Sequence, residues 1–146
     1  MTVIAFNAPK EKEMHLVIRA ESTGEAHCYL YENTSIDAGE GTALAIYNRN
    51  RCNKKTSEVS TIEATPVIGS ATSFNETQAA TANITTTTEL WHFHLGVAVK
   101  KASEGGAGRG VNEWILGCSI QYAVVLQSAT DDDATQVISL NWYEQE

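Results

Sequence analysis

The sequence predicts an all-β protein, an antiparallel β-sandwich of jelly-roll or Greek-key type that folds as a single domain over residues 1–146. Apolar and polar residues alternate along several short runs that are rich in Val, Ile, Tyr and Trp, which is typical of half-buried strands. Turn-forming residues separate these runs. No run of convincing length has the spacing of an amphipathic helix, so the pattern favours packed sheets.

The composition favours a folded chain and narrows the choice of partners. Hydrophobic residues make up 42% and charged residues 19% of the chain, which is ordinary for a globular protein and argues against disorder. The formal net charge of −8 argues against a direct nucleic-acid partner, because a phosphate backbone attracts clustered Lys and Arg. No apolar run approaches the roughly 20 residues that span a bilayer, and the N-terminus lacks a secretory pattern, so we expect no membrane partner.

The cysteines indicate a reducing environment. The chain has 3 of them, Cys28, Cys52 and Cys118, and an odd, scattered set does not suit a disulfide framework. Cys28 and Cys118 lie among apolar residues in the sequence, and we expect both to be small core residues. The chain is therefore expected to fold in a reducing cytoplasm.

The N-terminal residues predict a short strand followed by a break. Residues 1–6 are apolar and suit a strand, and Pro9 ends it because proline cannot continue a central ladder. We expect this stretch to form a short N-terminal arm of about residues 1–10.

The next two runs predict a hairpin. Strands are expected at Glu13–Glu21 and Ala26–Glu32, joined by a turn at residues 22–25. In the first strand, Met14, Leu16 and Ile18 share one face, and His15, Val17 and Arg19 share the other. In the second strand, His27, Tyr29 and Tyr31 share one face, and Cys28 and Leu30 point the other way.

The middle of the chain predicts two further strands and a loop. The strands are expected at residues 43–47 and 58–65, after turn chemistry at residues 33–42. The Gly-rich stretch Ser103–Gly110 predicts a flexible loop, since glycine adopts many backbone conformations.

The clearest alternation lies in Glu89–Lys100 and predicts a strand with one core-facing stripe. The stripe consists of Trp91, Phe93, Leu95, Val97 and Val99. His92 and His94 share the opposite face, because residues two apart on a strand project the same way.

This His92-x-His94 pair is the most metal-like feature of the sequence. A zinc or nickel ion could use two imidazoles on one strand face, but it would need a third ligand. His15, His27 or a carboxylate could supply that ligand, and nothing in the sequence places one. Two surface histidines are the alternative, and we expect no metal or other cofactor, with His92 and His94 as weak candidates.

The C-terminal third predicts three strands, at residues 112–116, 120–127 and 136–144. A polar turn at residues 128–133 has the length and polarity to join the last two as a hairpin. The alternation predicts a core-facing set made of Ile120, Tyr122, Val124, Leu126, Ile138, Leu140 and Trp142. Tyr143 falls on the opposite phase and is a candidate for a contact with a partner.

Other motifs argue against catalysis. Asp131–Asp133 lacks the spacing of a calcium loop, and residues 105–110 lack the Gly-Lys-Ser/Thr ending of a phosphate loop. There is no Gly-x-Ser-x-Gly, and no cysteine lies in a catalytic signature. We therefore expect no catalytic residues and no enzyme; a metal-dependent enzyme built on His92 and His94 is the alternative.

The order of five motifs resembles that of a family of small virion structural proteins of tailed bacteriophages. The motifs are His27–Glu32, Gly41–Arg51, Gly108–Leu116, the strand around Tyr122, and Ile138–Glu144. They span most of the chain, and residues 58–90 match loosely. No single motif is highly specific, so the resemblance rests on their order.

The resemblance implies a capsid decoration, or cement, protein with a β-sandwich or jelly-roll fold. Such proteins bind the outer surface of an icosahedral head and hold neighbouring major capsid subunits together, commonly as dimers or trimers. The implied partners are the major capsid protein and further copies of this chain, on the head of a virion made in the host cytoplasm. The alternative is a fibre or tail-associated module that binds a receptor or glycan through its aromatic residues.

The contact candidates come from the expected arm, loops and exposed strand phases. They are Val3, Phe6, Arg49, Arg51, Lys54, Lys55, Arg109 and Tyr143.

Overall fold

β-Strands and their connections account for the described part of the chain. The computed structural model describes residues 2–34, 42–47, 60–64, 88–95, 103–106, 113–129 and 134–145. The strands are β1 (Thr2–Asn7), β2 (Glu13–Ser22), β3 (Ala26–Glu32), β4 (Thr42–Ala43), β5 (Ser60–Ala64), β6 (Thr88–Leu95), β7 (Ser103–Gly106), β8 (Trp114–Leu116), β9 (Gln121–Ser128) and β10 (Gln136–Gln145). Within these ranges, a search for a helix long and apolar enough to cross a membrane finds none.

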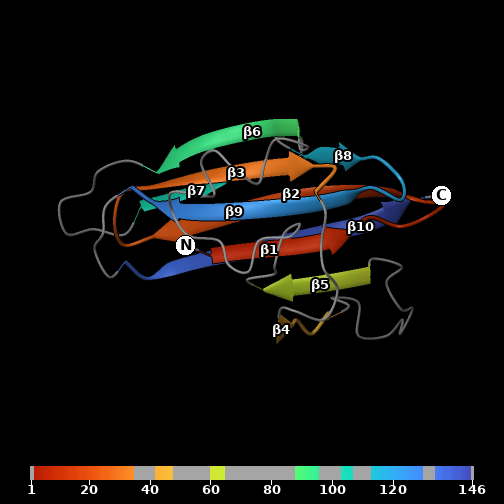
Figure 1. The fold of residues 1–146 in the computed structure, drawn as a ribbon, viewed down its shortest axis with the longest axis horizontal. Coiled ribbons are helices and arrows are strands. Elements are labelled where there is room, and N and C mark those ends of the chain that lie inside the picture. Colours follow the sequence, from red (N-terminus) through yellow and green to blue (C-terminus); the bar gives the residue numbers. More distant parts are fainter. Residues whose placement is uncertain are drawn as a thin grey trace.

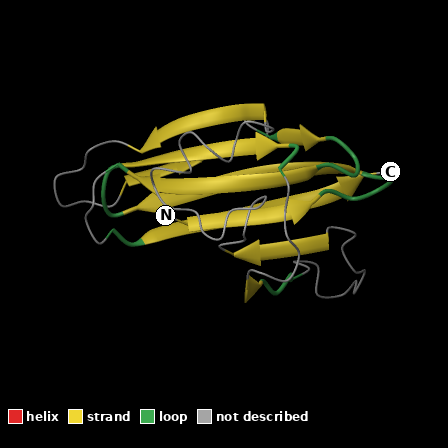
Figure 2. Cartoon of the chain, in the orientation of Figure 1, coloured by secondary structure: helices red, strands yellow, loops and turns green. Residues whose placement is uncertain are grey.

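The strands form two antiparallel sheets, which confirms the predicted all-β antiparallel sandwich (Figures 1 and 2). Sheet A has the order β4-β5-β1-β9-β3-β6. Sheet B has the order β10-β2-β7, and β8 also pairs with β2. Strands β4 and β6 are therefore the two outer strands of sheet A in the described part of the chain.

The main core lies between the two sheets. Side chains from the apolar faces of the strands fill it. The predicted core residues Cys28, Leu95, Tyr122, Val124 and Leu126 are buried in it, as are Met14, Leu16, Ile18 and Leu30. Trp91, Phe93, Ile120, Ile138, Leu140 and Trp142 are partly buried against it. Val97 and Val99 lie outside the described residues. The alternation of side chains along each strand thus predicted which face turns inward.

Strand β1 lies inside sheet A, so the expected N-terminal arm is wrong. It pairs with β9 along its whole length, from Thr2 opposite Leu126 to Asn7 opposite Gln121, and with β5 on its other side. Its four central residues are buried whatever their phase. A strand that is buried on both faces has a continuous apolar run instead of an alternation.

A second buried cluster explains the continuous apolar run of β1. Ile4 and Phe6 point into the main core, whereas Val3, Ala5, Tyr31, Ala123 and Val125 form a separate cluster on the outer face of sheet A. Tyr29 packs against its margin. Strands β1 and β9 therefore contribute apolar side chains to both faces of sheet A.

Neither predicted hairpin forms. Strand β2 belongs to sheet B and β3 to sheet A, and β9 and β10 are divided in the same way. Each pair is joined by a connection that crosses from one sheet to the other, and hydrogen bonds tie the two connections together. Thr23 N donates to Thr135 O over 3.0 Å, and Ala129 N donates to Glu25 O over 2.9 Å. The alternation along a strand is the same whether its successor pairs with it or faces it, so the sequence pattern could not distinguish the two.

The two described cysteines differ in their surroundings. Cys28 is fully buried, and this burial raises the pKa of its thiol to about 12. The expectation for Cys118 is wrong, since it lies exposed in the connection from β8 to β9, where its Sγ donates to Lys12 O over 3.4 Å. That connection turns back at Ser119, which has a φ of 58°.

The interior position of β1 predicts how far the free energy of unfolding falls when its aromatic residue, Phe6, is truncated. Phe6→Ala should lower the free energy of unfolding by about 3–5 kcal/mol, the usual cost of removing a buried aromatic ring. Ile115→Ala is the matched control, because Ile115 is 62% exposed, and should change the free energy by less than about 0.5 kcal/mol. Urea unfolding followed by tryptophan fluorescence measures both. A Phe6→Ala variant as stable as the control would contradict the interior position of β1.

Candidate functional site

Two clusters of polar and aromatic side chains lie on the outer faces of the sandwich. The sheet-A histidine cluster consists of His27, Tyr29, His92 and His94, together with Glu25. The sheet-B histidine cluster consists of His15, Glu113 and Tyr143.

The pairing of β3 with β6 builds the sheet-A histidine cluster. His27 lies opposite His94, and Tyr29 lies opposite His92. His27 Nδ1 is 2.9 Å from His92 Nε2, and His94 Nε2 is 2.9 Å from Glu25 Oε1. The fold thus brings His27 and a carboxylate to the His92-x-His94 pair, a juxtaposition that the sequence alone did not place.

The rings of this cluster stack on one another. The ring centroids of His27 and His94 are 4.7 Å apart, and those of Tyr29 and His92 are 4.4 Å apart, with interplanar angles of 27° and 17°. Tyr31 continues the row, with its ring 5.6 Å from that of Tyr29. Because these ring faces cover each other, the cluster offers its ring edges, with their nitrogen and hydroxyl groups, to the surroundings.

One ring nitrogen of each histidine in this cluster has a hydrogen-bond partner. His27 and His92 bond to each other, while His94 bonds to Glu25. Across the described residues, no group of three or more His, Cys, Asp or Glu side chains is arranged to hold a metal ion. His92 and His94 therefore lie beside a third imidazole without forming a ready ligand set, and the expectation of no cofactor stays a prediction.

Burial and neighbouring charges shift the proton affinities in the row. Burial lowers the pKa of His27, as do His94 and His92, while Glu25 opposes them. Burial raises the pKa of Tyr29, and Glu89 adds to the rise. The pKa of Tyr31 is raised further, by burial first and then by Glu89 and Tyr29. Each of these shifts favours the uncharged form of His27, Tyr29 or Tyr31.

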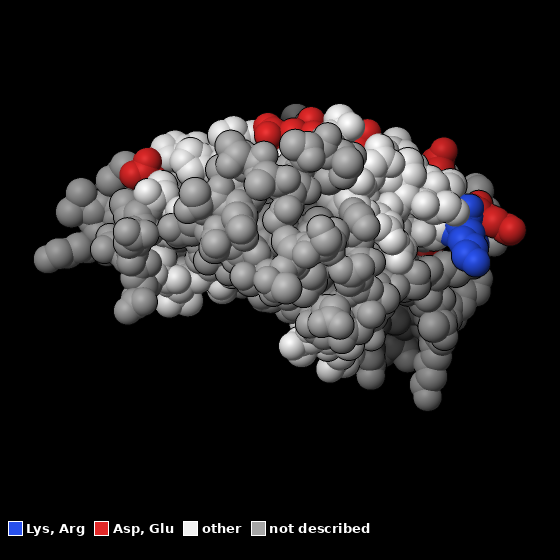
Figure 3. All heavy atoms as spheres, viewed as in Figure 1, with Lys and Arg blue, Asp and Glu red and all other residues white. Residues whose placement is uncertain are grey.

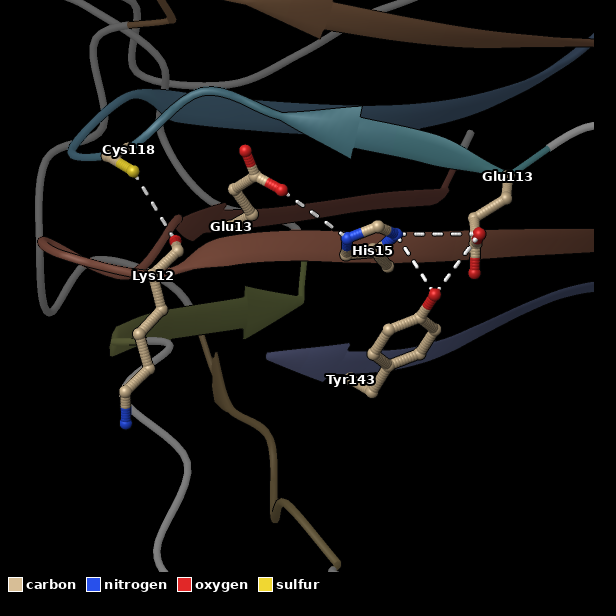
Figure 4. Close-up of polar contacts among 6 residues, drawn as sticks. All are labelled: Lys12, Glu13, His15, Glu113, Cys118 and Tyr143. Atoms are coloured by element: carbon tan, nitrogen blue, oxygen red, sulfur yellow. Dashed lines mark hydrogen bonds and ion pairs between the residues drawn. The ribbon is translucent and has the colours of Figure 1, made fainter. Parts of the chain in front are cut away.

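The sheet-B histidine cluster joins β2, β10 and the residue that precedes β8 (Figure 4). His15 on β2 lies opposite Tyr143 of β10 and opposite Ile115 of β8. The rings of His15 and Tyr143 stack with centroids 4.5 Å apart, and Tyr143 Oη is 3.0 Å from His15 Nδ1. Tyr143 Oη also donates to Glu113 Oε2 over 3.3 Å, and the same carboxylate oxygen is 3.4 Å from His15 Nδ1.

His15 is buried although it points away from the main core. Its Nε2 makes no hydrogen bond in the structure, and the nearest carboxylate, Glu13 Oε2, is 3.7 Å away. A buried nitrogen without a partner costs free energy, so its interactions at Nδ1 carry the polar stabilisation of this side chain. Tyr143, a contact candidate from the sequence, is 39% exposed and holds His15 in place.

The remaining contact candidates divide into buried residues and residues without a described position. Val3 and Phe6 are fully buried, so they are not on the surface and the expectation of contacts through them is wrong. Their apolar character suits contacts with a partner and burial within the fold equally well. Arg49, Arg51, Lys54, Lys55 and Arg109 lie outside the described residues.

One exposed apolar segment was missing from the predicted contacts. Residues 42–47 are all exposed, and this segment carries Leu44, Ile46 and Tyr47, which are 38%, 40% and 77% exposed. The predicted strand at residues 43–47 is shorter in the structure, where β4 ends at Ala43. The missed signal is an apolar run that directly follows a Gly-rich turn, because such a run can form a short edge as well as a core strand.

Figure 3 shows where the charged side chains of the described residues lie on one face of the molecule. Acidic side chains of the described residues lie along the upper edge, where Figure 1 places β6, and at the end of the molecule that carries the C-terminus. The basic side chains visible in this view are at that same end. An acidic edge attracts basic surfaces of a partner over a distance of about 10 Å at moderate salt.

Comparisons of the chain with models of known protein families, with curated proteins and with solved structures find no match. The motifs of the sequence and the geometry of these surfaces are therefore what indicate its function.

The hydrogen bonds of the Tyr143 hydroxyl predict that it contributes measurably to the free energy of unfolding. Tyr143→Phe keeps the ring that stacks on His15 but removes the hydrogen bonds, which should lower the free energy of unfolding by about 1 kcal/mol. Tyr47→Phe makes the same chemical change at a 77% exposed residue and should leave stability unaltered. Urea unfolding measures both variants. Equal stability of the two variants would show that the Tyr143 hydroxyl holds nothing in place.

Proposed function

We propose that this chain is a decoration, or cement, protein of a bacteriophage head. It binds the outer surface of the icosahedral shell, contacts the major capsid protein, and associates with further copies of itself as a dimer or trimer. Its location is the surface of the virion head, after synthesis in the host cytoplasm. The proposal joins the order of the sequence motifs with an exposed apolar segment beside a rigid sheet.

The exposed segment 42–47 is the observation that carries the proposal. It continues from β4, an outer strand of sheet A, and β4 pairs with β5, which in turn pairs with β1. Leu44, Ile46 and Tyr47 thus follow a short strand that is connected through β5 to the buried strand β1. Apolar side chains gathered on a surface mark contact sites, and aromatic residues often carry much of the binding free energy.

A repeated weak contact suits this architecture. A shell presents the same surface many times, so modest contacts made by an oligomer add up through avidity. Binding to the assembled shell then stabilises it by mass action. This function needs a stiff fold and exposed contact residues, and it needs no catalytic group.

The arrangement of the aromatic residues favours this function over a glycan-binding module. A sugar ring packs against the open face of an aromatic side chain, whereas the rings of Tyr29 and His92 cover each other at 4.4 Å. Trp91, Trp114 and Trp142 are partly buried and pack against the main core. The aromatic residues of the described surface therefore provide fewer open ring faces than the sequence suggests.

Shell binding tests the proposal directly. Purified protein should co-sediment with phage heads that lack it and should raise the temperature at which they break open. Tyr47→Ser should weaken binding about 30-fold or more, which corresponds to about 2 kcal/mol for a central contact residue. The variant should keep the stability of the wild type, because its side chain is largely exposed.

Val137→Ser is the matched control, since Val137 is 46% exposed on β10 of the other sheet, and it should bind as the wild type does. Absence of co-sedimentation, with no change in the disruption temperature, would contradict a decoration function. Saturable binding to host cells or surface glycans in the same preparation would instead support the fibre or tail alternative.

A further inference from the structure

The sheet-A histidine cluster lies on an outer strand. In the described part of sheet A, β6 is the last strand and β3 is its neighbour. On the outer face, His92 and His94 of β6 contact β3 and its preceding turn through His27, Tyr29 and Glu25. On the inner face, Trp91 and Phe93 pack against the core while partly exposed. The outward side-chain contacts of β6 are therefore made mainly by titratable groups.

The distance between His27 and His92 limits how many protons the pair can hold. Nitrogen atoms 2.9 Å apart share one hydrogen bond, with one ring donating and the other accepting. The pair accommodates this arrangement with both rings neutral or with one ring charged. If both rings were protonated, two N–H groups would face each other, and the contact would have to open.

In the part of the chain that the structure describes, few charges around the pair could balance added protons. Glu25 precedes β3 and already bonds to His94. Glu89 of β6 acts on Tyr29 and Tyr31, and neither tyrosine carries a charge near neutral pH. On the other side of β3, strand β9 places Gln127 opposite His27 and Val125 opposite Tyr29, and both residues are uncharged. Among the described residues, the three imidazoles thus have one carboxylate in direct contact.

From this geometry we propose that the His27–His92 contact is a proton-operated latch that fastens β6 to sheet A and opens in mildly acidic solution. With neutral rings, the hydrogen bond and the stacked rings hold β6 against β3. The hydrogen bond persists when one ring is charged, and uptake of a second proton by the pair breaks it and leaves like charges side by side. The consequence is a local opening of β6, while sheet B keeps its structure.

The direction of the His27 pKa agrees with this behaviour. Its pKa lies below the ordinary value of 6.5 through burial and the two neighbouring histidines. His27 in the folded chain therefore takes up a proton less readily than it would in an opened or unfolded chain. The stability from this group is fully present above pH 6.5, and it is lost as the pH falls from 6.5 through the lowered pKa of His27.

Amide hydrogen exchange tests the latch on the intact chain. Exchange is measured at about pH 7.5 and about pH 5, the range in which histidines titrate, and corrected for the intrinsic effect of pH on exchange. Protection of β6 should fall towards pH 5, by up to about tenfold per pH unit for each extra proton that the open form binds. Protection of β2 and β10 should stay constant, which provides an internal reference.

Substitutions then assign the effect to the pair. His27→Gln keeps a neutral polar group beside His92 and removes the titration, so the loss of β6 protection in acid should disappear. His92→Gln should have the same result and provides a second test if His27→Gln does not fold. Tyr29→Phe keeps the ring that stacks on His92 and should keep the full response of the wild type.

Three outcomes would overturn the latch. The first is β6 protection that does not change with pH in the wild type. The second is an equal fall in the wild type and in both glutamine variants. The third is an equal loss of protection in β6, β2 and β10, which would indicate global unfolding instead of a local opening.

Discussion

The burial of β1 and β9 on both faces is the constraint on which the rest of the structure depends. Their side chains fill the main core on one face of sheet A and a second apolar cluster on the other. Burial of each large apolar side chain stabilises the fold by roughly 1.5–3 kcal/mol. Separating β1 from β9 would therefore cost a large amount of free energy. Every other strand of sheet A is attached to this pair, with β5 and β4 on the side of β1 and β3 and β6 on the side of β9.

This arrangement gives the two borders of sheet A different properties. At the β4 border, the chain leaves the sheet at once and carries exposed apolar side chains. At the β6 border, histidines and tyrosines replace apolar residues on the outer face. A hydrophobic contact loses little strength with pH, whereas a contact between imidazoles changes over one or two pH units. The proposed docking segment and the proposed latch therefore lie on opposite borders and follow different physical rules.

The sequence predicted the fold class and the inward phases of the strands, because both follow from residues that are close in the chain. Met14, Leu16 and Ile18 are buried as their alternation requires. The pairing of the strands could not be predicted in the same way. The interior position of β1 depends on partners near residues 62 and 124, and the crossing from β2 to β3 leaves the same alternation as a hairpin would.

In the candidate sites too, the sequence predicted features set by neighbouring residues but not contacts between residues far apart in the chain. His92 and His94 were recognisable from their spacing, but His27 joins them across 65 residues through the register of β3 and β6. Tyr143 was correctly assigned to the outer face, yet its contact with His15 depends on a strand pair that spans 128 residues. Cys118 lies among apolar neighbours in the sequence but in an exposed connection, since neighbours in a tight turn need not share an environment.

Electron cryomicroscopy of phage heads incubated with this protein tests the central claim most directly. The account predicts density for a β-sandwich on the outside of the shell, at positions related by its icosahedral symmetry, with residues 42–47 against the major capsid protein. Heads that stay bare at saturating protein, or density on the tail or fibres alone, would contradict it.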